Sequence, residues 1–442
     1  MSTITKREGR FLYDVSVTFG SRVLGLAFTV LASVVAARFL GPSGKGTLAV
    51  IGLVSSLAVQ LGGLGLHAST TYFAARDSGA LPRIAGLSLW IAAVMGTLLS
   101  SLILGVAWLF PHSLNEVPGR FVFVAVAIIP FGLVSLFFQN ILLGLQRILT
   151  LNLVDLAGKA AGLVVTVVFL PLLGLGVWEL LLAGLIIGAG ASLGTVWLVT
   201  REAPPAMAIN PDFACSMLRY GMKFYLSCLL AYLVIRVDLL MVNYFSGVSE
   251  AGIYSVSTAF ADLLYVLPVS IGTVLFPRIA RDQIGEGSLT LKACRYTVLL
   301  MAGICLTAAV AARPAILLLY GKVFAGSIPP FLWLLPGIFL LSIEGVLAND
   351  LAGRGYPAVI VGYWLVGLVL NIGLNLVMIP RWGANGAAAA STVTYALMFA
   401  LVFRCFLAES GLPWRRALLL EPAEIRGLFR SFRKLLVVPD GR

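Results

Sequence analysis

Long apolar stretches, separated by short polar ones, fill the chain from Phe11 to Leu407. Most hold about 20 residues or more, the length that an α-helix needs to cross the hydrocarbon core of a bilayer. Only helices and closed barrels satisfy every backbone polar group there, and barrel strands would alternate in polarity. The pattern predicts an all-α integral membrane protein with about twelve transmembrane helices. The expected spans are 12–37, 46–73, 84–109, 121–143, 148–170, 175–199, 215–243, 250–276, 291–312, 329–348, 357–379 and 385–407.

The pattern occurs twice along the chain. Residues of the first copy fall on residues of the second at an offset of 206, pairing Gly41 with Gly247 and Gly46 with Gly252. Farther on the offset is 209, and it pairs Asn140, Gly144, Pro171 and Gly174 with Asn349, Gly353, Pro380 and Gly383. Six spans per copy is an even number, so both copies enter the membrane from the same side. We therefore expect two six-helix lobes related by a pseudo-twofold axis along the membrane normal, an arrangement common in secondary transporters.

Polar segments mark the expected boundaries of the two lobes. Residues 1–203 form the predicted amino-terminal lobe, 204–214 a cytoplasmic linker, 215–407 the carboxy-terminal lobe and 408–442 a cytoplasmic tail. Pro204, Pro205 and Pro211 interrupt helix in the linker. In the tail, apolar positions from Ile425 to Leu436 recur every three or four residues between Arg and Lys, which predicts a basic amphipathic helix on the anionic inner leaflet.

Composition supports a membrane location. Hydrophobic residues make up 60% of the chain, charged residues only 11%, and the mean hydropathy is +1.00. Placing the amino terminus and every second loop in the cytoplasm puts most of the 31 Lys and Arg there, so both termini are expected to be cytoplasmic. The net charge of +12 then reflects topology and does not indicate nucleic acid. The five cysteines show no metal-ligand spacing, and we expect no disulfide, metal or cofactor.

Two segments carry a family resemblance. Arg38 to Gly46, RFLGPSGKG, and the longer segment from Arg236 to Arg281 resemble the bacterial polysaccharide flippases of the multidrug/oligosaccharidyl-lipid/polysaccharide exporter superfamily. The resemblance implies a V-shaped pair of six-helix lobes in the cytoplasmic membrane. It also implies a lipid-linked glycan substrate, carried as undecaprenyl-pyrophosphate repeat units from the inner to the outer leaflet, and polysaccharide polymerase machinery as a partner. A complete cleft fits within one chain, so a monomer is expected to suffice.

A flippase of this kind needs a hydrated, positively lined groove, because a pyrophosphate loses several kcal/mol or more of solvation in hydrocarbon. Three basic residues lie deep in the predicted spans: Arg22, Lys159 and Arg236. Arg22 lies about 16 Å into its span, near the bilayer midplane, and should face either the cleft or a buried partner. Lys159 follows Asp155 by four residues, so it is either half of an intrahelical ion pair or a cation of the cleft.

Acidic residues in the spans are candidates for a gate or for ion coupling. Asp238 lies about 200° around the helix from Arg236, so the two cannot neutralise each other on one face. Asp262 in the next span is a candidate partner for Arg236, either as a structural clasp or as a gate that breaks during transport. Glu344 has no partner in its own sequence neighbourhood and is either a neutral buried acid or a proton-coupling site.

Three further polar residues are candidates for the cleft. His67 follows the glycine-rich segment LGGLGLH, and it is either a packing residue or a polar group of the cleft. Asn371 and Asn375 lie four residues apart on one helix face, where they could contact sugar hydroxyls or bond to neighbouring helices.

Other functions are also compatible with the sequence. An ion-coupled multidrug exporter of the same superfamily would favour acidic residues for organic cations, whereas this chain carries three deep basic ones. A lipid II flippase is expected to have two more transmembrane helices than the twelve predicted for this chain. A membrane enzyme of polysaccharide assembly would need an extended outer region, and no predicted outer loop is long. A passive scaffold would gain nothing from charges within its spans.

Overall fold

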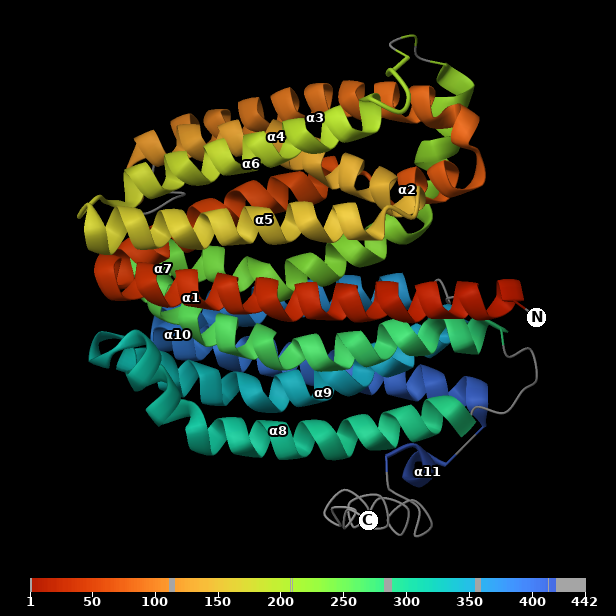
Figure 1. Cartoon of the computed structure of the whole chain (residues 1–442). Coiled ribbons are helices and arrows are strands. Elements are labelled where there is room, and N and C mark those ends of the chain that lie inside the picture. Colours follow the sequence, from red (N-terminus) through yellow and green to blue (C-terminus); the bar gives the residue numbers. More distant parts are fainter. Residues whose placement is uncertain are drawn as a thin grey trace, which may run out of the picture. The chain divides into compact units, whose positions relative to one another are not determined.

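The computed structural model describes residues 2–110, 116–206, 208, 210–281, 288–353, 359–411 and 413–418. Over these residues the chain is helical and contains no strand (Figure 1). The helices are α1 (Ser2–Gly62), α2 (Leu66–Arg76), α3 (Leu81–Leu109), α4 (Gly119–Gly144), α5 (Ile148–Val167), α6 (Val177–Thr200), α7 (Pro211–Arg281), α8 (Ser288–Tyr320), α9 (Ile328–Gly353), α10 (Val359–Ser410) and α11 (Trp414–Leu418). Three short helical turns join them, η1 (Ser78–Ala80), η3 (Val168–Leu172) and η4 (Lys322–Ser327).

Within the described residues, nine helices are long and apolar enough to cross a membrane. Three of them, in α1, α7 and α10, have apolar segments of 43, 42 and 52 residues. Each is far longer than one crossing requires, and each contains one glycine with non-helical backbone angles: Gly41, Gly247 or Gly383. Counting each of these as two crossings gives the predicted twelve.

The reversal of α1 at Gly41 is visible in its side-chain contacts. Lys45 Nζ donates to Ser33 Oγ at 2.8 Å, although the two residues are twelve apart in sequence. Twelve residues of straight helix would separate them by about 18 Å, which is beyond the reach of a lysine. Gly41 has φ 67°, and Pro42 follows it in the first turn of the returning segment, where its missing N–H costs nothing.

The repeat predicted from the sequence is present in the backbone. Gly41 and Gly247 have φ of 67° and 85°, and Gly174 and Gly383 have φ of 63° and 55°. A β-carbon is disfavoured in this left-handed region, so glycine is favoured at both members of each pair.

A side chain repeats in the same way. Asn140 Nδ2 donates to the carbonyl of Leu136 at 2.8 Å, and Asn349 Nδ2 makes the equivalent bond to the carbonyl of Gly345 at 2.7 Å. Each asparagine thus bonds back by one helical turn at the same place in its copy, as expected for a structural duplication.

The chain forms two compact units. Unit 1 comprises residues 1–256, 316–327 and 379–384, and unit 2 comprises 257–315, 328–378 and 385–442. In unit 1, α3, α4 and α6 run side by side (Figure 1), and a buried cluster that includes Ile129, Phe137 and Ile141 of α4 packs against α3. Because α4 is apolar on every side, it can occupy the middle of this bundle.

Unit 2 is organised around α9, the most buried of its membrane-crossing helices. Close approach to α10 depends on Gly337, where a β-carbon would come within 2.9 Å of the backbone of Thr392. The Thr392 hydroxyl in turn donates to the carbonyl of Trp333 at 2.5 Å. In a bilayer the hydrophobic effect does not drive helices together. Close packing at small residues and hydrogen bonds from hydroxyl groups stabilise their contacts instead.

One expected span differs from the structure. Residues 46–73 were expected to form a single helix, but α1 ends at Gly62 and α2 begins at Leu66. Leu64 and Gly65 have φ of 45° and 70°, and a β-carbon on Gly65 would lie 2.3 Å from the carbonyl oxygen of Gly221. The break lets two backbones meet, a close approach that the glycines of this segment permit. The amphipathic helix expected over 425–436 lies outside the described residues.

Candidate functional site

A polar strip joins α1 and α5 in unit 1. Asn152 Nδ2 donates to Thr18 Oγ1 at 3.0 Å, and a β-carbon on Gly25 would lie 3.0 Å from the side chain of Lys159. Both contacts join residues 134 apart, so the two helices are parallel and in constant register. Arg22 lies between Thr18 and Gly25 on the same face of α1.

That register places Arg22 opposite an ion pair on α5. Lys159 Nζ lies 2.6 Å from Asp155 Oδ2, and the two side chains are 37% and 44% exposed. Arg22 is exposed and forms no ion pair with any residue that the structure describes. The strip therefore holds two cations and one carboxylate on segments that are long and apolar enough to cross a bilayer. Its net positive charge suits an anionic ligand.

The acidic and basic residues predicted on α7 lie in different settings. Asp238 is buried, and its carboxylate accepts hydrogen bonds from the Tyr254 hydroxyl at 2.5 Å and from the Leu239 backbone N–H. It therefore links the two arms of α7 across the turn at Gly247. Arg236 and Asp262 are both half-buried and neither is isolated. They belong to unit 1 and unit 2 respectively, and their pairing remains a prediction.

Unit 2 contains the other polar candidates. Glu344 is 2% exposed, and its Oε1 atom has no hydrogen-bond partner among the residues that the structure describes. Asn375 Nδ2 donates to Asn371 Oδ1 at 2.9 Å, and Asn371 Nδ2 lies 3.4 Å from the hydroxyl of Thr394. The Oδ1 atom of Asn375 is buried, and no described residue donates a hydrogen bond to it. Unpaired buried oxygens are costly, and in a transporter they are candidate positions for a proton or a cation.

His67 lies in the first turn of α2, immediately after the break that contains Gly65. It is half-buried, and its backbone carbonyl accepts hydrogen bonds from the hydroxyls of Thr70 and Thr71. Its imidazole makes no polar contact with the described residues that would set it apart from a packing residue. A role for His67 as a polar residue of the substrate cleft remains a prediction.

A group of contacts at the helix reversals did not emerge from the sequence. Besides its bond with Lys45, Ser33 Oγ lies 3.2 Å from the hydroxyl of Tyr320, and Arg38 donates to the carbonyls of Leu318 and Leu319 at the end of α8. These carbonyls are the free acceptors of a helix terminus, where a cation is favoured.

Two glutamates make matching contacts at the other reversals. Glu116 accepts from the N–H of Val248, and Glu250 accepts from the N–H of Ala384, each at 3.2 Å. Both N–H groups follow a left-handed glycine and begin a returning helix, where a carboxylate is favoured. We call Ser33, Arg38, Lys45, Glu116, Glu250 and Tyr320 the turn cluster. The signal in the sequence was a charged residue beside each glycine turn.

The fold is that of the membrane transporters in the multidrug and lipid-exporter superfamily. The chain superimposes on a solved inward closed conformation of the lipid II flippase MurJ with a TM-score of 0.73 and 14% identity, covering 97% of this chain and 94% of that one. An inward-facing multidrug resistance MATE family transporter of the MOP superfamily gives 0.72 and 14% identity, over 88% of this chain and 94% of that one.

Sequence comparison identifies the family. The pattern of the polysaccharide biosynthesis protein family matches residues 35–329, and the chain belongs to that family. A relative of known role is the succinoglycan biosynthesis transport protein ExoT of Rhizobium meliloti (strain 1021). It is 24% identical over 454 residues, which cover 98% of this chain and 84% of ExoT.

Proposed function

We propose that this protein is a flippase that moves lipid-linked oligosaccharide, carried on undecaprenyl pyrophosphate, from the inner to the outer leaflet of a bacterial cytoplasmic membrane. Membership of a polysaccharide biosynthesis family and the transporter fold support the general class. The polar strip of α1 and α5 is the observation that favours an anionic substrate, because Arg22 faces a pair in which Asp155 can neutralise only one of two cations.

The proposed chemistry is binding and release, without any covalent step. A pyrophosphate that enters the bilayer region loses water, and Arg22 with Lys159 replaces part of that hydration by charge-assisted hydrogen bonds. Asp155 holds Lys159 in place between substrates and limits the excess charge. The ionic headgroup and sugar pass between the two lobes, residues 1–203 and 215–407, while the lipid tail stays in hydrocarbon.

Alternating access requires contacts that form at one end of the passage and break in turn. In the proposed topology both termini are cytoplasmic, so the reversals at Gly41, Gly247 and Gly383 are on the outer side. The turn cluster would then hold the outer end closed. Its hydrogen bonds to backbone N–H and C=O groups are individually worth about 0.5–3 kcal/mol, weak enough to break during a cycle.

The test is a flipping assay in proteoliposomes loaded with a fluorescent undecaprenyl-pyrophosphate oligosaccharide. Arg22→Ala is expected to lower the transport rate by roughly tenfold or more, the effect of losing one charge-assisted contact. Arg22→Lys should retain part of the rate, because it keeps the charge and loses only the bidentate geometry. Unfolding temperatures should match those of the wild type, since Arg22 forms no ion pair among the described residues.

An organic-cation exporter is the competing outcome. Wild-type vesicles that move a cationic dye down an imposed gradient but leave the lipid-linked glycan in place would overturn the flippase proposal. Failure of Arg22→Ala to alter glycan flipping by an active wild type would instead remove the polar strip from the mechanism.

A further inference from the structure

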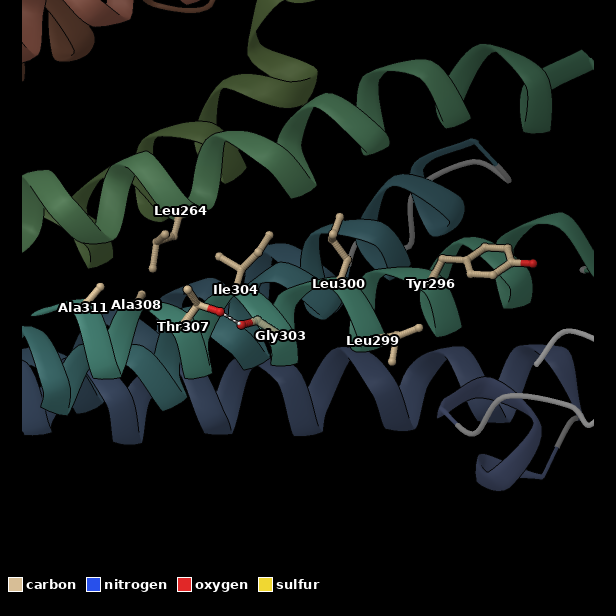
Figure 2. Close-up of a pocket in the computed structure, with 9 residues that line it drawn as sticks. All are labelled: Leu264, Tyr296, Leu299, Leu300, Gly303, Ile304, Thr307, Ala308 and Ala311. Carbon is tan, nitrogen blue, oxygen red and sulfur yellow. Dashed lines mark hydrogen bonds between the residues drawn. The ribbon is translucent and has the colours of Figure 1, made fainter. Parts of the chain in front are cut away.

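An apolar groove runs along the outside of α8 in unit 2. It has a volume of about 780 Å³, within the range of about 300–1,000 Å³ that ligand sites in proteins occupy. Leu264 of α7 points into it from one side, and the remaining lining residues all come from α8 (Figure 2). Those residues are Tyr296, Leu299, Leu300, Gly303, Ile304, Thr307, Ala308 and Ala311.

The groove follows a single stripe of the helix. From Tyr296 to Ala311 its lining residues recur every three or four positions, which keeps them on one face over roughly 22 Å. This length is most of the hydrocarbon thickness of a bilayer, about 30 Å. The segment Thr290–Tyr320 is itself long and apolar enough to cross the membrane. The groove is thus oriented along the direction in which a lipid chain lies.

The described lining is mostly apolar, and its two hydroxyl groups belong to Tyr296, at the end nearest Lys292, and to Thr307. Thr307 Oγ1 donates to the carbonyl of Gly303 at 2.8 Å, so its donor is satisfied within the helix (Figure 2). The floor is made wide by small residues: a β-carbon on Gly303 would meet nothing within 4 Å. A branched hydrocarbon chain needs such width, whereas the described lining residues from Leu299 to Ala311 offer a polar ligand no free hydrogen-bond donor.

A cation stands at one end of the stripe. Lys292 is exposed and lies one turn before Tyr296 on the same face of α8. It has no ion pair with any residue described by the structure. A phosphate at this end would meet an ammonium group, and Tyr296 is of the residue type that prefers the boundary between headgroups and hydrocarbon. A groove with a cation at one end and an apolar lining along the rest matches an amphiphile with one anionic headgroup.

We propose that this groove binds the isoprenoid tail of the lipid-linked substrate, with the phosphates beside Lys292 and the first isoprene units over Gly303 and Thr307. The inference rests on the proposed flippase function and adds a site for the part of the substrate that does not enter the polar passage. Holding the tail at a fixed place on α8 keeps the headgroup on the protein, which raises its effective concentration for transport.

The test uses two neighbouring positions on α8. Thr307→Trp fills the groove, whereas Leu306→Trp adds the same ring at an adjacent position, where the native leucine is 69% exposed and does not line the groove. Purified protein in bilayers receives a diazirine-bearing polyprenyl pyrophosphate, or a diazirine-bearing phosphatidylglycerol as the ordinary lipid, and cross-linked peptides are mapped.

The polyprenyl probe is expected to label the 296–311 segment of the wild type and of Leu306→Trp. Labelling should fall roughly tenfold in Thr307→Trp, because a few CH₂ groups of the probe can no longer be buried there. Lys292→Ala should weaken labelling by the pyrophosphate probe only. Equal labelling by both probes, or equal labelling of both tryptophan variants, would overturn the proposal. If the wild-type protein labels as expected but flips no lipid-linked sugar, the result would support the groove as a lipid-binding site and contradict the proposed flippase function.

Discussion

Gly46 and Gly252 face each other backbone to backbone, and they occupy the same position in the two copies of the repeat. A β-carbon on Gly46 would lie 1.8 Å from the carbonyl oxygen of Val248, and one on Gly252 would lie 1.9 Å from that of Pro42. Val248 is itself the equivalent of Pro42 at the offset of 206. The contact is therefore reciprocal, as at a twofold axis, and the local pseudo-axis passes between these two glycines.

Gly46→Ala is expected to destabilise the protein. The new methyl group meets a backbone carbonyl that cannot move without shifting a helix, so we expect a loss of about 1–3 kcal/mol and a lower unfolding temperature in detergent micelles. Gly52→Ala is the matched control, because Gly52 lies in the same arm of α1 with nothing within 4 Å of its β-carbon position. It should leave stability unchanged or raise it by up to about 1 kcal/mol. Equal behaviour of the two variants would contradict the close contact.

Glu250→Ala should weaken the turn at Gly383. It removes the acceptor for the N–H of Ala384 at a helix start, which is worth about 0.5–2 kcal/mol, whereas Glu250→Gln keeps a carbonyl acceptor and should lose less. Thermal unfolding of both variants measures the difference. Glu409→Ala, at an exposed position, serves as a control expected to stay within about 0.5 kcal/mol of the wild type. No separation between the alanine and glutamine variants would mean that the cap contributes little.

Asp155→Asn should change substrate binding in the opposite direction from Lys159→Ala. The first leaves Arg22 and Lys159 without a carboxylate, so the apparent affinity for a pyrophosphate-linked glycan is expected to rise severalfold, at low ionic strength above all. The second removes a cation and should lower it. Titration of glycan binding at two salt concentrations checks both. A decrease in affinity for Asp155→Asn would show that the Asp155–Lys159 pair serves the structure alone.

Glu344→Gln tests the buried acid of α9. One oxygen of Glu344 is buried without a partner in the described part of the chain, so a neutral amide of the same shape should be tolerated with little change in unfolding temperature. We expect flipping by this variant to lose its response to an imposed pH gradient while downhill flipping persists. Glu344→Ala, which leaves a cavity, should lower the unfolding temperature in addition. A pH response in Glu344→Gln equal to that of the wild type would remove this residue from coupling.

The number and kind of the helices could be predicted because the deciding features are local. A run of about 20 apolar residues is a crossing helix wherever it lies in the chain. Gly41, Gly247 and Gly383 were evident as repeat positions, because a reversal that needs a left-handed backbone angle selects glycine in each copy. The Asp155–Lys159 spacing was visible for the same reason, since residues four apart in a helix are neighbours.

The positions of those helices against one another could not be predicted. A helix that is apolar on every side does not mark which face will be packed, and its rotation is set by its neighbours. The bond from Asn152 to Thr18 and the contact between Ser33 and Tyr320 join residues 134 and 287 apart. No spacing rule connects such residues.

The sequence by itself thus determined a duplicated, all-helical membrane protein with charges placed deep in its spans. Only the tertiary structure decided that α1 and α5 lie in a register that sets Arg22 beside the Asp155–Lys159 pair, that Gly46 meets Gly252, and that α8 carries a groove beside Leu264. Each of these depends on helix rotation and register. Those quantities follow from the packing of whole surfaces, and the order of residues along one helix encodes them only weakly.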